Sequence, residues 1–404
     1  MNPIPYGRQH ITEEDIQAVV DVLKSDYLTQ GPKIAEFETA FAKYIGVNYA
    51  VAVANGTAAL HLCTLALGVK PGDKVITTPI TFAASANCVR YAGGDVVFAD
   101  IDSDTYLLDI KSVEELLKAS PKGTFQGIIP VDFAGRAIDM EAFRRLANEY
   151  GCWIIEDACH APGGFFSDSK GTKHNCGNGD FAELAIFSFH PVKHIAAGEG
   201  GMITTNNEDL YKKLLVLRTH GITKDINSFQ NPIEVAYGEQ LDTLSLEPET
   251  SYPAWYYEMQ ELGFNYRLTD FQAALGLSQL NRANEGLIRR KEIAQTYHEA
   301  FKGKSYIKGQ SGFIDGHGYH LYIVEVDNRK GLYEYLRKNN IFAQIHYIPV
   351  HLMPYYKQFG WIEGDLPTAE FYYKGCLSLP MYPTLNKLEQ EFVIKSIVSF
   401  FEEK

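Results

Sequence analysis

The sequence has no long hydrophobic stretch, no excess of basic residues and no closely spaced pair of cysteines. No apolar run approaches the length of about 20 residues that a helix needs to cross a bilayer. The first residues, MNPIPYGRQHITEED, also lack the charged and then apolar pattern of a secretion signal. We therefore expect a cytoplasmic protein that does not act at a membrane.

The charge balance argues against a general nucleic-acid-binding protein. The chain carries 50 acidic and 37 basic side chains, for a formal net charge of -13, whereas nucleic-acid-binding proteins normally present a basic stripe. The cysteines contain no CxxC pair and are Cys63, Cys88, Cys152, Cys159, Cys176 and Cys376. We expect buried free thiols, with neither disulfides nor a metal site.

Short β-rich runs alternate with helical patterns over the first half of the chain. The β-rich runs between residues 49 and 205 are YAVAVA, KVITT, VVFAD, GIIPV, CWIIED, AIFSF and GMITT. Strands that alternate with helices predict an α/β fold, with a mostly parallel sheet covered by helices on both faces.

A chain of 404 residues is too long for one simple core, so we expect at least two domains. We predict a large domain over residues 1–262, with an irregular insertion at about 222–257 that is flexible or forms an interface. Residues 263–404 would begin with a long helix through roughly Phe301. They would continue as a smaller α+β domain that contains HLYIVEVD, IFAQIHYI and a terminal helix from about Asn386.

The stretch FSFHPVKHIAAGEGG, residues 187–201, carries the strongest chemical signal. Pro191 restricts the turn before Lys193, and the glycines that follow allow tight turns or a close approach of the backbone. This pattern indicates a reactive lysine on a restrained loop, with Ser188 as a phosphate contact. An ordinary surface lysine beside a glycine-rich hairpin is the alternative.

Ligands of parallel α/β proteins gather beyond the C-terminal ends of the strands. The turn ANGTAA, residues 54–59, follows one such strand and opens a helix. Backbone N–H groups of Gly56, Thr57 and Ala58, together with the Thr57 hydroxyl and the positive helix end, would form a phosphate seat. A simple helix cap explains the same residues.

Three more residues follow strands or lie close to their ends. Asp157 ends the strand CWIIE, where it would pair with a protonated pyridine nitrogen or form an ordinary salt bridge. Phe82 would stack on an aromatic cofactor or lie in the core. His160 would bond a cofactor oxygen or be a buried structural histidine. The order of these features, ending with Ser188 and Lys193, predicts pyridoxal phosphate (PLP).

The same segments resemble those of a known family. The segments ANGTAAL, TPITFAASAN, GIIPV, IIEDACHA, FSFHPVKHI, GEGG and GFNYRLTD are similar to the DegT/DnrJ/EryC1/StrS nucleotide-sugar aminotransferases, and the resemblance spans nearly the whole chain. It implies a fold-type-I PLP-dependent transferase with a mostly parallel seven-stranded sheet and a smaller α+β C-terminal domain.

The resemblance also implies a role for each matched residue. Lys193 would bind the cofactor covalently and act as the catalytic base. The other cofactor contacts would be Thr57, Ala58 and Ser188 at the phosphate, Asp157 at the pyridine nitrogen, Phe82 on the ring and His160 near the ring hydroxyl. Asn265, in GFNYR, would reach the phosphate in a neighbouring subunit, so a homodimer is implied. Ala196 and Ala197 replace an expected threonine pair, and residues 238–250 form a longer segment than usual.

The implied reaction moves an amino group from L-glutamate to C4 of a UDP-linked 4-keto-6-deoxy-N-acetylhexosamine, with pyridoxamine phosphate as the intermediate. The pathway would make pseudaminic acid, another nonulosonic acid or a related surface glycan. LTQGP (28–32) and HYIPVH (346–351) resemble loops that line the sugar site. His346 and His351 would either line that site or be structural, and Arg267 is a carboxylate clamp or a structural residue.

Three other functions compete with this one. The first is amino transfer to another nucleotide-linked keto sugar. The second is PLP- or pyridoxamine-phosphate-dependent sugar dehydration, which is disfavoured because that class carries histidine where this chain has Lys193. The third, a non-catalytic cofactor sensor, is disfavoured because Lys193, Asp157 and Ser188 are all present.

Overall fold

A seven-stranded sheet forms the centre of the structure, a computed structural model that describes residues 2–237, 252–310 and 312–402. The strand order is β2-β10-β9-β6-β5-β3-β4, and within this sheet β10 alone is antiparallel to its neighbours. The strands are β2 (Tyr49–Val53), β3 (Lys74–Thr77), β4 (Asp95–Phe98), β5 (Phe125–Ile129), β6 (Trp153–Asp157), β9 (Leu184–Ser188) and β10 (Gly201–Thr205). The expected mostly parallel sheet is confirmed, and each strand overlaps a predicted run.

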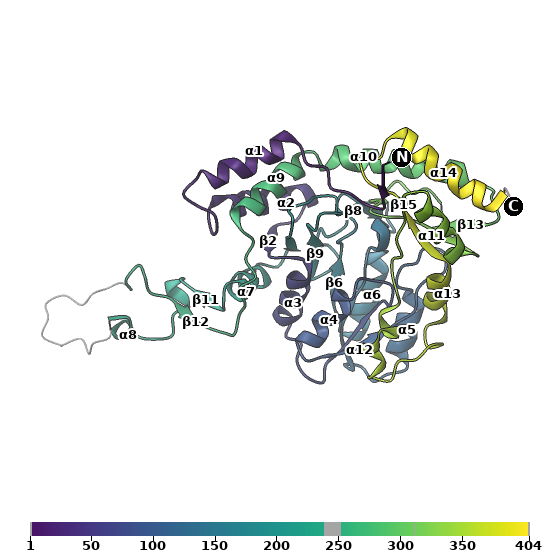
Figure 1. Cartoon of the computed structure of the whole chain (residues 1–404). Helices are drawn as coiled ribbons and strands as arrows, with labels where there is room; N and C mark the ends of the chain where they lie inside the picture. Colours follow the sequence, from purple (N-terminus) through teal and green to yellow (C-terminus); the bar gives the residue numbers. More distant parts are fainter. Residues whose placement is uncertain (1, 238–251, 311, 403–404) are drawn as a thin grey trace, which may run out of the picture.

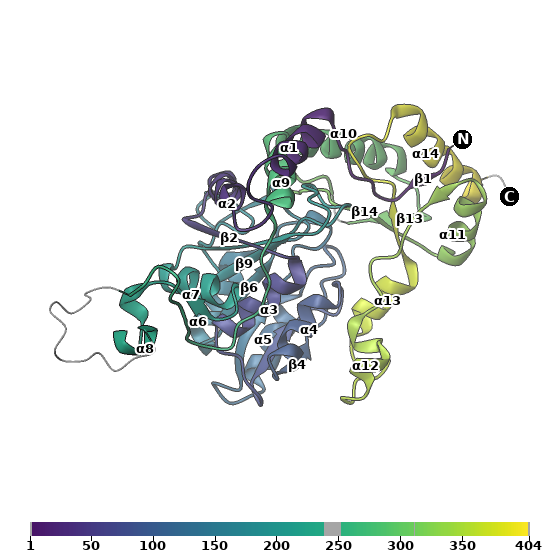
Figure 2. The ribbon, with the colours of Figure 1, turned by 60° about the vertical axis from the view of Figure 1, so that its left-hand side comes forward.

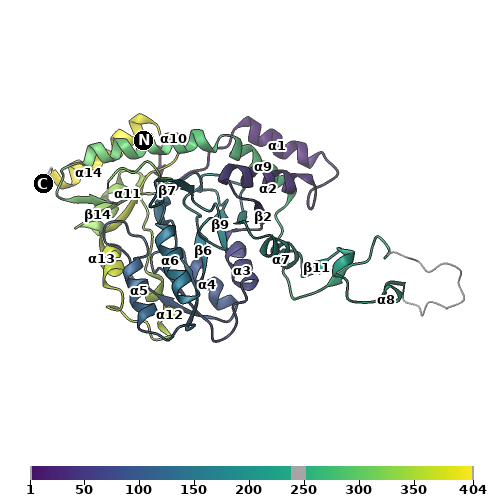
Figure 3. The same ribbon diagram turned by 180° about the vertical axis from the view of Figure 1, so that it is seen from behind.

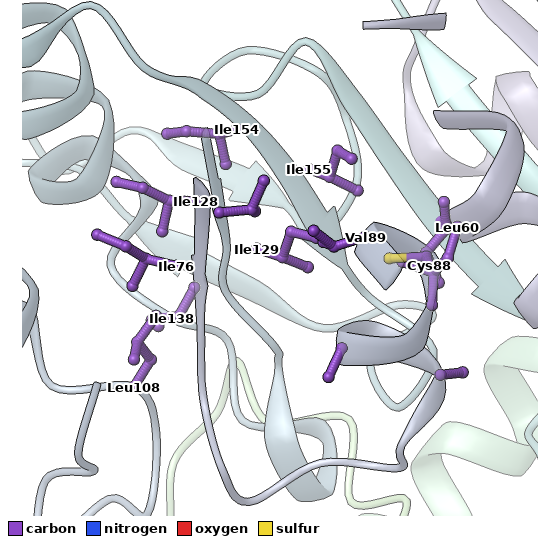
Figure 4. Close-up of a cluster of buried hydrophobic side chains, with 14 of the residues drawn as sticks. Leu60, Ile76, Cys88, Val89, Leu108, Ile128, Ile129, Ile138, Ile154 and Ile155 are labelled. Carbon is purple, nitrogen blue, oxygen red and sulfur yellow. The ribbon is translucent and has the colours of Figure 1, made fainter. Parts of the chain in front are cut away.

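Helices cover both faces of this sheet. Adjacent strand residues such as Ile128 and Ile129 point to opposite faces (Figure 4). Ile129 lies on the side of Val89 in α4, and Ile128 lies on the side of Leu108. The helices of the large domain include α2 (Pro32–Ile45), α3 (Gly56–Ala66), α4 (Ala84–Tyr91), α5 (Ile110–Lys118), α6 (Met140–Tyr150) and α7 (Glu208–Arg218). Two buried faces explain why these strands are almost continuously apolar.

The predicted long connecting helix is two helices, α9 (Asp270–Asn281) and α10 (Ala283–Phe301). The break falls at Arg282, which has φ -117° and ψ 15°. Its guanidinium pairs with the buried Asp15 of α1 (Glu13–Leu23) and donates to the carbonyl of His10. This contact with the N-terminal segment was not visible in the helical pattern.

The smaller domain is built on an antiparallel sheet, as its α+β pattern predicted. Its strands are β13 (Ile307–Gly309), β14 (Tyr322–Val326) and β16 (Cys376–Leu379), and its helices are α11 (Arg329–Lys338), α12 (Pro354–Lys357), α13 (Pro367–Gly375) and α14 (Lys387–Glu402). The segment IFAQIHYI, which was predicted to belong to this domain, contains little regular structure. It forms only β15 (Ile341–Phe342), and beyond it Gln344 pairs with Ser378.

The N-terminal residues belong spatially to the smaller domain. β1 (Ile4–Pro5) pairs in parallel with β15, and Ile4 is buried in the core beside α11 and α14. The chain then crosses to α1 on the large domain (Figures 1 and 2). The domain boundary between residues 262 and 263 stays a prediction. The first residues of the chain fall on the large-domain side of this boundary in the sequence, but they pair with a strand from the other side of it.

An arm projects from the large domain in all three views (Figures 1–3). It contains β11 (Ile222–Thr223), a short 3-10 turn (Ile226–Ser228), α8 (Ile233–Tyr237) and β12 (Glu258–Met259), with β11 antiparallel to β12. The described residues of the predicted insertion therefore include short regular elements that are too short to give a sequence pattern, and the role of this segment as a flexible or interface insertion stays a prediction. The predicted extra length at 238–250 lies outside the described residues.

Two smaller observations complete the fold. A hairpin of β7 (Phe165–Ser167) and β8 (Lys173–Asn175) lies outside the predicted runs. Among the helices that the structure describes, none combines the length and apolar character needed to span a membrane.

Candidate functional site

A cavity of about 460 Å³ lies where the strands of the central sheet end and the smaller domain begins. Residues that end or follow β2, β3, β6 and β9 form one wall, as expected for a parallel sheet. Six predicted site residues line the cavity: Thr57, Phe82, Asp157, His160, Ser188 and Lys193. The structure therefore brings these side chains together, and their individual roles stay predictions.

The turn between β2 and α3 approaches Ser188 closely. A Cβ added to Gly56 would lie 3.1 Å from the Ser188 Cβ, and one added to Gly201 would lie 2.6 Å from the Asn55 carbonyl. Glycine is therefore required at residue 201 to allow this close approach of the two backbone segments. The turn places the N-terminus of α3 and two hydroxyls, from Thr57 and Ser188, at one end of the cavity. That combination fits a phosphate group.

The backbone N–H group of Ala58 takes part in the cap of α3. It donates to Asn55 Oδ1 at 2.8 Å, and Ala58 is not among the residues that line the cavity. The helix cap is therefore formed, and the contact of this N–H group with a phosphate stays a prediction. The cap arises because an asparagine at the N-cap satisfies a donor of the first turn.

Asp157 is a buried carboxylate that faces the cavity. Its side chain accepts hydrogen bonds from the Ser85 hydroxyl at 2.7 Å and from the Cys159 N–H at 3.2 Å. It makes no ion pair with any lysine, arginine or histidine that the structure describes. The salt-bridge alternative is thus not formed, and a buried carboxylate at a cavity wall is suited to a cationic ligand atom.

Lys193 lies on the loop after β9, fixed by a hydrogen bond of 2.8 Å from its N–H to the His190 carbonyl. Burial lowers the pKa of its amine below the ordinary lysine value, whereas Cys159 and Asp157 act in the opposite direction and Arg290 adds to the lowering. A lower pKa increases the neutral fraction, which is the form that can attack a carbonyl or accept a proton.

Phe82 and His160 occupy different environments. Phe82 is 64% exposed and lines the cavity, so the alternative of a core phenylalanine is wrong. His160 is buried, and its Nδ1 accepts the Ala134 N–H at 3.2 Å. Burial holds the His160 pKa well below its usual value. The neutral ring therefore carries its proton on Nε2, which lies 3.4 Å from the Tyr347 hydroxyl at the cavity.

The opposite wall combines residues that the motifs did not identify with residues of the loop HYIPVH. Tyr6 and His320 line the cavity, together with His346 and Tyr347 of that loop. The rings of His160 and His320 are 4.4 Å apart between centroids, and His320 Nδ1 is buried without a partner among the described residues. Tyr6 follows a very short strand and His320 lies in a loop, so no local sequence pattern identifies these two residues.

Four other candidates lie elsewhere. His351 is buried outside the cavity and its Nε2 contacts Glu370 at 3.0 Å, which supports the structural alternative. Arg267 and the loop LTQGP do not line this cavity. Asn265 is exposed and also lies outside it, so its predicted contact with a neighbouring subunit stays a prediction.

All six cysteines are free thiols, as expected. One of them, Cys176, offers a sulfur atom that lies within 4.8 Å of carboxylate oxygens of Asp132 and Glu156. The expectation of no metal site stays a prediction.

Comparisons with known proteins agree with this arrangement. A family profile described as the DegT/DnrJ/EryC1/StrS aminotransferase family matches residues 9–398. The spore coat polysaccharide biosynthesis protein SpsC of Bacillus subtilis is 37% identical and aligns with 98% of this chain and 96% of its own. The UDP-4-amino-4,6-dideoxy-N-acetyl-beta-L-altrosamine transaminase of Campylobacter jejuni is 36% identical and aligns with 99% of this chain and 98% of its own.

Solved structures are similar over the full length. Helicobacter pylori PseC, an aminotransferase of pseudaminic acid biosynthesis, superposes with a TM-score of 0.85 at 29% identity and full coverage of both chains. The putative sugar aminotransferase Spr1654 of Streptococcus pneumoniae has a TM-score of 0.85 in its PMP form, at 29% identity and 99% coverage of both chains, and is also known in a PLP form.

Proposed function

Since the chain belongs to the DegT/DnrJ/EryC1/StrS aminotransferase family, we propose that it transfers an amino group from L-glutamate to C4 of a UDP-linked 4-keto-6-deoxy-N-acetylhexosamine. The product would serve the synthesis of pseudaminic acid or a related surface glycan. The protein is a PLP-dependent sugar aminotransferase of fold type I. The observation that supports the reaction best is the single cavity shared by Lys193, Asp157, Ser188 and Thr57.

The residues of the cavity fit the cofactor. Thr57 and Ser188 would hold the phosphate beside the N-terminus of α3, and Asp157 would hold the pyridine nitrogen in its protonated form. Phe82 would cover one face of the ring, and His160 would donate its Nε2 proton toward the ring oxygen. A phosphate contact from Ala58 would compete with Asn55 for the same N–H group.

The proposed proton transfers assign one task to each residue. When bound, PLP supplies a covalent attachment for the amine and an electron sink for the bond that breaks at Cα. Lys193 would accept the proton that leaves Cα of glutamate and would act as the acid that returns it. Asp157 keeps the proton on the pyridine nitrogen throughout. With the keto sugar, Lys193 moves the proton in the reverse direction.

The opposite wall would bind the substrate. Burial lowers the pKa of His346 to about 3, so this ring is neutral near pH 7. Tyr347 is also neutral, because burial raises the pKa of its hydroxyl. Uncharged donors and acceptors suit the hydroxyl and amide groups of an N-acetylated sugar. The name of the C. jejuni relative supports a UDP-linked acceptor of this class.

A second candidate is amino transfer to a different nucleotide-linked keto sugar. It is supported by SpsC, which is as similar in sequence and is named for the biosynthesis of a spore coat polysaccharide.

The two candidates are separated by an isotope experiment. The purified protein with PLP is incubated with ¹⁵N-labelled L-glutamate and the UDP-4-keto-6-deoxy-N-acetylhexosamine, and the nucleotide sugar is analysed by mass spectrometry. We expect ¹⁵N in the sugar product, and equal amounts of 2-oxoglutarate. Label in a different keto sugar alone would favour the second candidate, and no transfer to any keto sugar would contradict both.

We also propose that the protein acts as a homodimer in which Asn265 reaches the partner's cofactor phosphate. Asn265 is exposed outside its own cavity, and the neighbouring arm exposes large apolar side chains, including Trp255 at 64% and Leu262 at 79%. Mixing Lys193→Ala with Asn265→Ala chains tests this. Each variant alone should be impaired, and we expect activity to recover after the subunits exchange. No recovery in a demonstrably mixed dimer would contradict the proposed contact of Asn265.

A further inference from the structure

A second group of acidic residues is buried behind Asp157. Glu156 precedes Asp157 in β6, so its side chain points to the opposite face of the strand. There it meets Asp132 and Cys176, and the carboxylate and thiol atoms of the three residues lie within 4.8 Å of one another. Asp132 is 0% exposed, Glu156 4% and Cys176 2%. None of these residues lines the cofactor cavity.

Among the residues that the structure describes, no cation balances this group. Neither carboxyl forms an ion pair with a lysine, arginine or histidine among the described residues. One oxygen of each is satisfied by the backbone: Asp132 Oδ1 accepts the Ile138 N–H and Glu156 Oε1 accepts the Gly177 N–H, both at 2.9 Å. Asp132 Oδ2 is buried and has no donor from the described residues.

Two ionised carboxylates at this separation would repel each other and would both lack solvation. A proton on one of them removes a charge and supplies the donor that Asp132 Oδ2 needs. The other titratable groups around the pair are Asp157 and the thiols of Cys159 and Cys176. None of these can supply a positive charge.

We propose that Asp132 and Glu156 share one proton, and that this pair is a positioning element for Asp157. Asp132 donates its backbone N–H to the Asp157 carbonyl at 3.1 Å, and Asp157 donates its own N–H to the Pro130 carbonyl at 2.9 Å. The shared proton thus joins the loop after β5 to the end of β6, where Asp157 turns toward the cavity. The positioning role of the pair depends on the proposed function of Asp157 in holding the cofactor. The shared proton does not depend on that function.

The direction of the pKa values agrees with the geometry. Burial raises the pKa of Asp132 to about 6, and burial together with repulsion from Asp132 raises the pKa of Glu156 well above its usual value. Unfolded carboxyls lose their proton near pH 4. Between that pH and the native pKa of the pair, the folded protein holds a proton that the unfolded chain releases. Stability contributed by the pair therefore falls as pH rises through this range.

Infrared spectroscopy in D₂O tests for the shared proton directly. We expect wild type, without any cofactor, to show at neutral pH a C=O stretch of a protonated carboxylic acid. Glu156→Gln should lose this band, because an amide then replaces the protonated carboxyl, while the control Glu149→Gln on the surface of α6 should keep it. Absence of the band in wild type, or a stoichiometric divalent metal in the purified protein, would overturn the shared proton.

Urea unfolding between pH 5 and 8 gives a second measurement. One extra native proton makes the ratio of the unfolding constants of wild type and Glu156→Gln change by up to about tenfold per pH unit within the titration range. Wild type should lose stability relative to the variant as pH rises. A ratio that does not depend on pH would contradict the shared proton.

The positioning role is tested by the affinity for PLP. Gln can donate the hydrogen bond that a protonated Glu156 donates, so Glu156→Gln should bind PLP within about twofold of wild type. Glu156→Met has a similar size but no donor, and should bind PLP at least about tenfold more weakly. Equal affinity of both variants would overturn the positioning role. If the Met variant does not fold, more than tenfold weaker binding by the Gln variant would overturn it instead. Failure of wild type to bind PLP would refute the cofactor assignment and leave the infrared test intact.

Discussion

The two walls of the cavity come from different parts of the fold. One wall comes from the ends of parallel strands and holds Asp157, Ser188 and Lys193. The other comes from the N-terminal segment and the smaller domain and holds Tyr6, His320 and Tyr347. The first wall follows a general rule of α/β sheets. The second exists only because distant segments pack together.

The walls also differ in their charge. The strand-end wall combines a buried carboxylate with a lysine whose pKa is lowered by burial. The opposite wall carries neutral imidazoles and hydroxyls, since burial lowers the pKa of His320 and raises that of Tyr347. We infer that the first wall performs the chemistry and that the second recognises the substrate.

The largest effect is expected for Lys193→Ala in the strand-end wall. The variant should remain folded and still bind PLP, but turnover should fall by at least about 10⁴-fold, because the base that moves the proton is removed. Single-turnover kinetics with glutamate measure this effect. Near-normal amino transfer by the variant would contradict the assignment of Lys193.

A smaller but still large effect is expected for Asp157→Asn. The amide cannot stabilise a protonated pyridine nitrogen as a carboxylate does, so kcat should fall by about 10²- to 10³-fold. Asp104→Asn, at an exposed position, serves as the control and should retain normal activity. A kcat for Asp157→Asn within threefold of wild type (about 0.6 kcal/mol) would be inconsistent with this role.

Tyr347→Phe tests the opposite wall. Loss of one hydroxyl removes a hydrogen bond worth about 1 kcal/mol, so KM for the keto sugar should rise by about five- to tenfold. The affinity for PLP should change by less than about twofold. If the PLP affinity fell while KM stayed constant, the inference that the opposite wall recognises the substrate would be contradicted.

Acid should affect the stability of this wall rather than its activity. His346 titrates at about 3 in the native protein and near 6.5 when unfolded. Between these values the unfolded chain binds a proton that the native ring does not, so stability falls as pH drops below about 6.5. Each such imidazole contributes up to about 1.4 kcal/mol per pH unit. Urea unfolding at pH 7 and pH 5 should show a smaller loss for His346→Gln than for wild type, and an equal loss would contradict burial of this ring.

The sequence predicted most of the fold, because its strands are apolar and its helices carry clear caps. It failed where structure depends on distant partners. The break at Arg282 requires the buried Asp15, and the pairing of β1 with β15 joins segments far apart in the chain. The short strands of the arm give no periodicity at all.

The same reasoning explains the candidate site. Thr57, Asp157 and Lys193 were found because each follows or ends a strand with a recognisable pattern. Ala58 was assigned to the phosphate because a helix-terminal N–H is an anion donor; this N–H group also caps the helix through Asn55, a contact that the pattern left as an alternative. Tyr6 and His320 were missed because only tertiary packing brings them to the cavity.

The most direct test of the central claim is the visible absorption spectrum of the protein with PLP, recorded before and after L-glutamate and then after the UDP-4-keto-6-deoxy-N-acetylhexosamine. We predict that the yellow band bleaches with glutamate and returns with the sugar, which would demonstrate both halves of the reaction on one sample. A band that does not bleach with glutamate, or that bleaches and does not return with this sugar, would contradict the proposed donor or the proposed acceptor, respectively.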